Sequence, residues 1–366
     1  MHYAQKRVAM KALADPAAKA FLIDIGTGTR DILLFDQTNS LENNAKIVAP
    51  TATRKMAKKI RAANKDLKIA GFTMGGGPLA SALTEHLGRG FKIEIEPSAA
   101  FTVRNNIEQL QQAGFTIREK IENPDLFFDE IELPAILDIF SRLGEETDNI
   151  GLIGLSVQDH GDHKLDESSR RKRFACFIEL LGESHDFRSL IFTPANLPAF
   201  FTRMRSGLES VRRSFPDTPV ILMDTCIAAV AGCAFDEKLT SVEGPILYVN
   251  FGNGHTLAMV IHGHKILSLY EHHTGMIKDK PEMIDDHLNR LVEGRLDYEE
   301  VFSSCGHGCK TFVPMPFDDL SAIVATGPRR DIVNRMQTSF YLAAPGGDMM
   351  MTGPLGLLKG FELNKG

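Results

Sequence analysis

The sequence lacks several features that mark particular classes of protein. No apolar run reaches the length of about 18 residues needed to cross a bilayer. Residues 1–20 carry lysine and arginine side chains but no apolar core, so they do not form a secretory signal. The five cysteines are sparse and odd in number, which argues against a disulfide framework. We therefore expect a cytoplasmic protein with reduced thiols.

The charge balance argues against two kinds of partner. A net charge of -6 gives no global attraction to nucleic acid or to an anionic membrane. The short basic run at 170–173 has no interleaved aromatic residues, so we interpret it as a solvated face or a helix start. A hydrophobic content of 43% and a length of 366 residues indicate a globular chain that is long enough for two domains.

Segment 21–36 is predicted to form a hairpin whose turn consists of glycine and threonine. Glycine lets a backbone approach a ligand closely, and successive N–H groups in such a turn form an anion-binding concavity. We expect the turn to bind phosphate, with Asp24 and Asp31 placed to hold a hydrated Mg²⁺. The alternative is a polar turn with solvated aspartates. The residues of the turn are Gly26, Thr27, Gly28 and Thr29.

Segment 245–270 repeats this pattern with different residues. An apolar strand, a glycine-containing turn and a second apolar strand are followed by a further turn at Gly263 and a third strand. A duplicated unit of strand, glycine turn and strand is the most informative feature of the organisation. The candidate binding residues of this second turn are Gly252, Gly254, His255 and Thr256.

Strands alternate with helices along much of the chain, which indicates an α/β fold with helices on the faces of its sheets. A buried strand over 150–157 leads into a polar loop that contains Asp159, His160 and His163. Such loops at the carboxyl ends of strands are where α/β sheets tend to place ligands.

Two later strands end in further candidate sites. The strand over 219–223 leads to Asp224, which either caps the small-residue helix over 228–234 or serves as a general base. The strand over 321–325 ends in a turn that contains Gly327, Pro328 and Arg329.

A competing site lies at Cys305, His307 and Cys309, which alternate with glycines. A loop of this kind could supply soft ligands to Zn²⁺ or iron, joined by Asp159, His160 or His163 if those residues lie near it. No third cysteine follows Cys309 at the spacing of a radical-enzyme iron–sulfur cluster, although two subunits that share one cluster would need only two cysteines each. The alternative is a surface loop with reduced thiols.

The order of these motifs resembles the actin-like ATPase superfamily, over about residues 21–361, with the weakest match at 133–214. That group includes actin, chaperone ATPases, sugar kinases and activator ATPases of 2-hydroxyacyl-CoA dehydratases. Within it the sequence most resembles an uncharacterised prokaryotic family labelled as a pyruvate formate-lyase activating enzyme. The resemblance implies an α/β fold with two ribonuclease H-like domains, at 20–215 and 216–366, and a nucleotide cleft between them.

The resemblance also implies roles for single residues. The turn at 26–29, with Asp24 and Asp31, is similar to a first phosphate loop, and the turn at 252–256 to a second. Residues 327–329 resemble an adenosine loop, and Asp224 stands where sugar kinases of this group have a catalytic base. The second turn has fewer small residues than is usual, and no sugar-binding signature is visible, which favours phosphate binding over sugar phosphorylation.

The expected function is therefore binding of Mg-ATP, with hydrolysis or transfer of the γ-phosphate to an unknown acceptor. Activation of a partner enzyme and a homodimer are both consistent with the resemblance. One alternative is a Zn- or Fe-dependent hydrolase or redox activator that uses the Asp159/His160/His163 and Cys305/His307/Cys309 loops. Another is a nucleotide-gated binding protein without turnover.

Overall fold

Two six-stranded sheets of related topology organise the chain. The computed structural model describes residues 13, 15–104, 106–161 and 168–365. In the first sheet, an antiparallel meander of three strands continues through β8 and β10, which run parallel to β1, and ends at β9. Its order is β3 (Ala45–Pro50), β2 (Thr29–Asp36), β1 (Lys19–Ile25), β8 (Ile150–Val157), β10 (Val220–Met223) and β9 (Ile191–Phe192).

The second sheet repeats this topology. Strands β11, β12 and β13 form an antiparallel meander, β15 pairs parallel with β11, and β14 extends the edge beside β13. The order is β14 (Gly306–Thr311), β13 (Lys265–His273), β12 (His255–His262), β11 (Ile246–Phe251), β15 (Ala322–Thr326) and β16 (Tyr341–Leu342). The repeat confirms the predicted α/β class with two ribonuclease H-like sheets.

The sheet order also bears on the predicted domain boundary at residue 215. Strand β10 pairs with β8 through Val220 to Met223, so the first sheet continues past that position. The apolar sequence of β10 explains its position inside the first sheet, because Ile221, Leu222 and Met223 are fully buried there between helices on both faces. The division into 20–215 and 216–366 stays a prediction.

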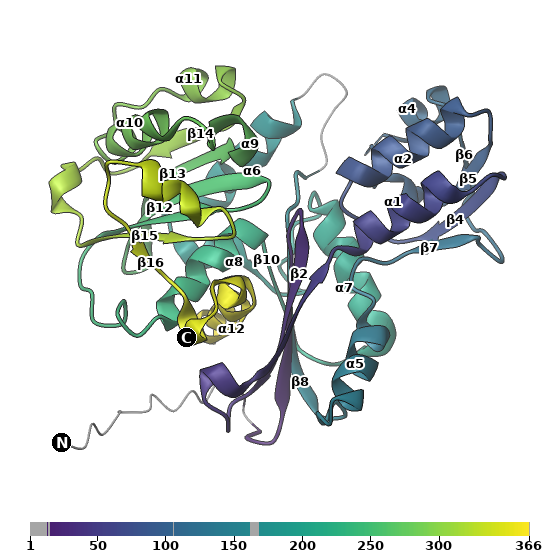
Figure 1. Cartoon of the computed structure of the whole chain (residues 1–366), viewed down its shortest axis with the longest axis horizontal. Helices are drawn as coiled ribbons and strands as arrows, with labels where there is room; N and C mark the ends of the chain where they lie inside the picture. The colour runs from purple at the N-terminus through teal and green to yellow at the C-terminus, as the bar shows by residue number, and fades with distance from the viewer. Residues whose placement is uncertain (1–12, 14, 105, 162–167, 366) are drawn as a thin grey trace.

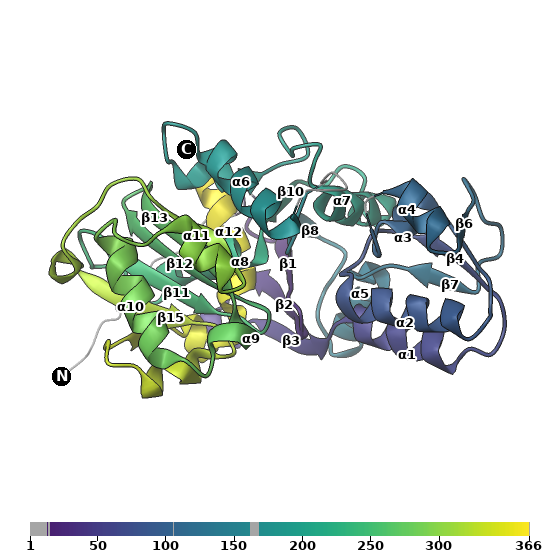
Figure 2. The ribbon, with the colours of Figure 1, turned by 90° about the horizontal axis from the view of Figure 1, so that it is seen from above.

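A smaller, four-stranded parallel sheet forms a separate layer beside the first sheet, at the right of Figures 1 and 2. Helices α1 and α2 pack together over it, with a core of their own. Its strands are β6 (Phe115–Ile117), β5 (Ile93–Ile95), β4 (Leu67–Gly71) and β7 (Leu126–Phe128), and its helices are α1 (Ala52–Ala62), α2 (Gly77–Gly88), α3 (Pro97–Ala100) and α4 (Ile107–Gln112).

Other helices cover the two large sheets. Helices α5 and α7 pack on one face of the first sheet, and α8 and α12 lie between the two large sheets, where one apolar core contacts both (Figure 1). No described helix combines the length and the apolar composition needed to cross a membrane. The helices are α5 (Leu133–Arg142), α6 (Ser169–Leu181), α7 (Thr202–Ser214), α8 (Thr225–Gly232), α9 (Thr274–Ile277), α10 (Pro281–Val292), α11 (Tyr298–Ser303) and α12 (Thr352–Asn364).

The central pair, α8 and α12, approach each other backbone to backbone. A methyl group added at Gly356 would lie 1.7 Å from the carbonyl oxygen of Ala228, and one at Gly232 would lie 1.8 Å from that of Thr352. Only glycine fits at these two positions, and the close approach holds the two large sheets at a fixed separation.

We therefore predict that Gly356→Ala lowers the free energy of unfolding by about 1–3 kcal/mol or more, because the new methyl group forces the helices apart. The matched control is Gly88→Ala at the end of α2, where an added methyl group meets no described atom within 4 Å. That control should change stability by less than about 1 kcal/mol. Chemical denaturation of both variants measures the difference, and equal effects would contradict the close packing.

Candidate functional site

The two glycine turns predicted from the sequence contact each other. A methyl group at Gly28 would lie 2.8 Å from the side-chain nitrogen of Asn253, and one at Gly254 would lie 2.5 Å from the Thr27 hydroxyl. Within the turns, the Gly26 N–H donates to Thr29 O at 3.0 Å, and the Gly252 N–H donates to His255 O at 2.9 Å. The turn at 26–29 of the first large sheet thus contacts the turn at 252–256 of the second, and we call this contact the seam.

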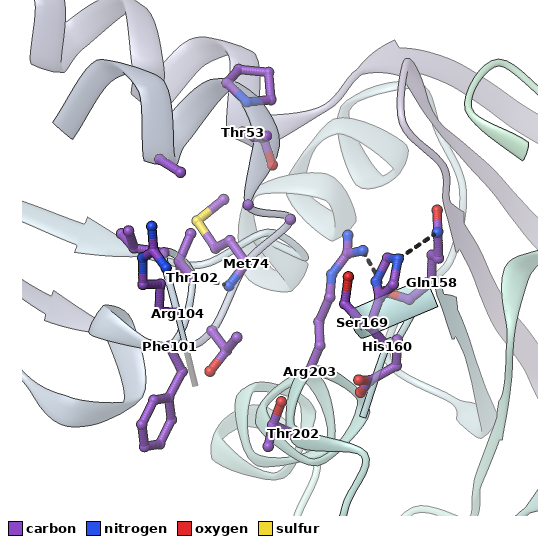
Figure 3. A pocket seen from close by; sticks show the side chains of 18 of the residues that line it. Thr53, Met74, Phe101, Thr102, Arg104, Gln158, His160, Ser169, Thr202 and Arg203 are labelled. Carbon is purple, nitrogen blue, oxygen red and sulfur yellow. Dashed lines mark hydrogen bonds between the residues drawn. The ribbon is translucent and has the colours of Figure 1, made fainter. Parts of the chain in front are cut away.

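A cavity of about 950 Å³ opens beside the seam. Thr27, Gly254 and His255 contribute to its wall from the two turns, and the segment between β4 and α2 contributes from the smaller sheet. Figure 3 shows Gln158, His160 and Arg203 on one wall, with Phe101 and Arg104 on the opposite wall. Its lining combines polar and apolar side chains and comes from both large sheets and the small one.

Arg203 stands at the cavity wall with its charge already balanced. It forms an ion pair with the buried Glu130 at 2.7 Å and donates to the carbonyl oxygen of Gln158 at 2.8 Å. The sequence did not indicate that Arg203 belongs to the site, because its carboxylate partner Glu130 lies 73 positions away.

Asp24 and Asp31 lie directly opposite each other on β1 and β2. Burial raises the pKa of Asp24 to about 6, against the effect of the Ser156 hydroxyl, which donates to it at 2.6 Å. Burial, and then the charge of Asp24, raise the pKa of Asp31 to about 8. One oxygen of Asp31 is buried and has no hydrogen-bond partner among the described residues. Two buried carboxylates with an unused oxygen form a donor set that fits Mg²⁺.

Asp224 is held in an ion-pair network rather than left open to the cavity. It caps α8 by accepting from the N–H of Cys226 at 3.0 Å. Both of its oxygens also accept from Arg173, at 2.6 and 3.0 Å. The predicted role as a cap is therefore confirmed, whereas the role as a general base stays a prediction.

Arg173 also reaches the second sheet. Its Nε donates to both oxygens of Glu271 on β13, at 2.9 and 3.0 Å, and all three side chains are almost fully buried. Despite the opposing effect of burial, Asp224 and Glu271 raise the pKa of Arg173. The basic run at 170–173 was predicted to be a solvated face or a helix start, and it lies in the first turn of α6. Arg173 itself is buried rather than solvated, because its partners lie 51 and 98 positions away in the sequence.

The segment predicted as a cysteine- and histidine-rich loop is in fact strand β14. A register irregularity in its pairing with β13 turns neighbouring side chains in different directions. His307 lies beside His160, His255 and His273, whereas the Cys309 thiol donates to the carbonyl oxygen of Leu296 in the core under α10.

Among the described residues, neither Cys305 nor Cys309 therefore shares a group of close ligand atoms with His307. His163 lies outside the described residues.

Two other predicted residues have structural partners. Asp159 accepts from the N–H groups of Gly161 and Met204, each at 2.9 Å, and so stabilises the start of α7. Gly327 adopts a positive φ of 94° and packs against Asn250 and Phe251. The turn at 327–329 does not line the cavity, so any adenosine site there would lie outside that space.

Comparisons with known proteins were made for sequence and for structure. The model of a family described as "Putative pyruvate format-lyase activating enzyme (DUF1786)" matches residues 74–332, which is most of the chain. None of the curated proteins matches the sequence.

Solved structures with partial similarity include an inorganic polyphosphate/ATP-glucomannokinase from Arthrobacter sp. strain KM. It has 12% identity and a TM-score of 0.37, and the match covers 95% of this chain and 99% of that one. An activator of the 2-hydroxyisocaproyl-CoA dehydratase from Clostridium difficile has 9% identity and a TM-score of 0.34, with 95% and 96% covered. The pSK41 ParM protein has 12% identity and a TM-score of 0.33, with 95% and 98% covered. Because all three scores are below 0.5, the fold rests on the sheet order of the chain itself.

The raised pKa of Asp31 predicts a pH dependence of stability. Between about pH 4 and pH 8 the unfolded chain releases a proton that the folded chain keeps, so the free energy of unfolding falls as the pH rises. Asp31→Asn should flatten this decline, whereas Asp217→Asn at an exposed position should leave it unchanged. Urea denaturation across this range measures the slope, and parallel profiles of wild type and Asp31→Asn would contradict the assignment.

The Arg173 network predicts that replacing Arg173 lowers the free energy of unfolding far more than replacing the nearby Arg171. Arg173→Met should lower the free energy of unfolding by about 3–5 kcal/mol, because it leaves two buried carboxylates without their cation. Arg171→Met, also on α6, removes an exposed ion pair with Glu299 of α11 and surface contacts with the rings of Tyr298 and Phe302, and should have a much smaller effect. Equal losses in denaturation experiments would show that the buried network does not hold the sheets together.

Proposed function

The chain belongs to the DUF1786 family, and we propose that it binds Mg-ATP at the seam between its two large sheets. In this proposal it hydrolyses the nucleotide or transfers its γ-phosphate to an acceptor in the adjoining cavity. The observation that carries the proposal is the direct contact between the turns at 26–29 and 252–256. Two backbone turns that meet in this way present N–H groups to one anion from both sides.

Asp24 and Asp31 are the residues that would hold Mg²⁺ beside the phosphates. Their raised pKa values reflect a site that is unfavourable for two negative charges in the absence of a cation. The unpartnered oxygen of Asp31 supports the fit, since a buried carboxylate oxygen without a donor is costly unless an ion or water occupies it. Bound Mg²⁺ would neutralise charge on the phosphates during transfer.

We assign the acceptor to the cavity, where polar side chains gather near the seam. The hydroxyl groups of Thr27 and Thr53, the amide of Gln158 and the paired Arg203 offer donors and acceptors to a polar molecule. In this arrangement Asp224 acts as a positioning residue, because both of its oxygens already accept hydrogen bonds from Arg173.

A thermal-shift experiment tests the nucleotide site. Millimolar ATP with Mg²⁺ should raise the melting temperature of the wild type, because ligand that binds only the folded state stabilises it by about 2.7 kcal/mol at a hundredfold excess over Kd. Asp24→Asn should abolish most of this shift, and ATP with excess EDTA should give a smaller one. The matched control is Asp36→Asn at the other end of β2, which should keep the full shift.

Measurement of phosphate release separates the possible outcomes of binding. Turnover without added acceptor indicates an ATPase, and turnover that requires a small polar molecule indicates a transferase. Binding without turnover indicates a nucleotide-gated protein that works through a partner. The absence of any Mg-ATP shift in a folded wild type would contradict the proposal.

A further inference from the structure

Four histidines from four strands or strand ends gather at one place on the cavity wall. His160 follows β8, His255 opens β12, His273 closes β13, and His307 lies on β14. The ring centres of His255 and His307 are 4.6 Å apart, and those of His160 lie 6.0 Å from His255 and 6.1 Å from His307. Residues that lie between 18 and 147 positions apart in the sequence thus converge on one point.

His307 is the member of this group whose position is hardest to explain without a ligand. Its side chain is fully buried, and neither ring nitrogen has a hydrogen-bond partner among the described residues. A buried imidazole with both nitrogens unsatisfied costs free energy, and native structures usually satisfy such groups. His160 and His255 line the cavity, whereas His307 is buried next to them, with its ring centre 4.6 Å from that of His255 and 6.1 Å from that of His160.

We propose that His160, His255 and His307 bind one divalent transition-metal ion of the kind that prefers imidazole, such as Zn²⁺. One ring nitrogen of each residue lies within 4.8 Å of a ring nitrogen of each of the others. Tetrahedral Zn–N bonds place such nitrogens roughly 3.4 Å apart, so only a modest inward movement of the side chains is needed. His160 is half-buried at the cavity and can make that movement.

The surroundings of the three histidines suit a metal ion. Burial, followed by the charges of Arg173 and neighbouring histidines, holds the pKa of His255 well below its usual value, and burial does the same for His307. Burial thus favours the neutral form of the His255 and His307 rings, which is the form that binds a metal. Nδ1 of His255 contacts the side-chain amide of Gln158, and one carboxylate oxygen of Glu271 lies 3.6 Å from it, beyond hydrogen-bond distance.

Three protein ligands leave a position free for water or for a ligand in the cavity. Because the cavity adjoins His160 and His255, that position would open toward it. The site is separate from the carboxylates proposed for Mg²⁺, and its ligands are nitrogens rather than oxygens. It therefore extends the proposed function, adding a second metal that would polarise a cavity ligand or activate water there.

A second group of close ligand atoms, Asp286, His287 and Glu300, provides a comparison. There the carboxylates already pair with Arg290, at 2.9 and 2.5 Å, and both lie exposed on the surface. This group therefore carries no comparable demand for a metal, and it serves as an internal control.

Titration of metal-free protein with Co²⁺ tests the proposal, because tetrahedral Co²⁺ absorbs visible light with a characteristic spectrum. The wild type should bind one Co²⁺ with that spectrum, and an equivalent of Zn²⁺ should displace it. His160→Ala should weaken binding at least tenfold while retaining the fold, since this side chain is half-buried. His255→Ala and His307→Ala should do the same, with circular dichroism confirming that each is folded.

The matched control is His262→Ala, which removes an exposed histidine from the other end of β12 and should leave Co²⁺ affinity unchanged. Loss of binding in His287→Ala but not in His160→Ala would place the metal at the surface group and overturn the proposal. Failure of folded wild-type protein to bind Co²⁺ or Zn²⁺ below about millimolar concentration would also overturn it.

Discussion

The buried ion-pair network of Arg173 is the interaction on which the arrangement of the two large sheets depends. Its guanidinium group joins Asp224, at the end of β10 in the first sheet, to Glu271, on β13 in the second. Removing three charges from water is costly, so the network persists only because the planar guanidinium satisfies both carboxylates at once. The same contacts fix where β12 begins, and with it the turn that meets Thr27 across the seam.

The electrostatics divide the site into two regions. On one side Asp24 and Asp31 bring together two buried carboxyl groups, a donor set that suits a hard cation. On the other, Arg173 lies near neutral imidazoles, and its positive charge helps to keep them unprotonated. Asp24 and Asp31 flank the turn at 26–29, whereas His255 belongs to the turn at 252–256, so each region adjoins one of the two turns that meet at the seam.

Short sequence patterns predicted those elements whose structure is determined by residues that are close in the sequence. The hairpins around Gly26–Gly28 and Gly252–Gly254 are confirmed, because alternating apolar runs and glycine turns determine them within a few residues. Strand β14 was missed, since its glycines favour a loop and only pairing with β13 makes it a strand. Arg173 and His307 could not be placed from sequence, because long-range contacts alone decide which charged or polar groups are buried.

The most direct measurement is a crystal structure with Mn²⁺ and a non-hydrolysable ATP analogue, with anomalous scattering used to locate the manganese. The account predicts density for phosphates between the turns at 26–29 and 252–256, and an anomalous peak beside the carboxylates of Asp24 and Asp31. Nucleotide bound elsewhere, or a seam that stays closed without phosphate at saturating analogue, would contradict it.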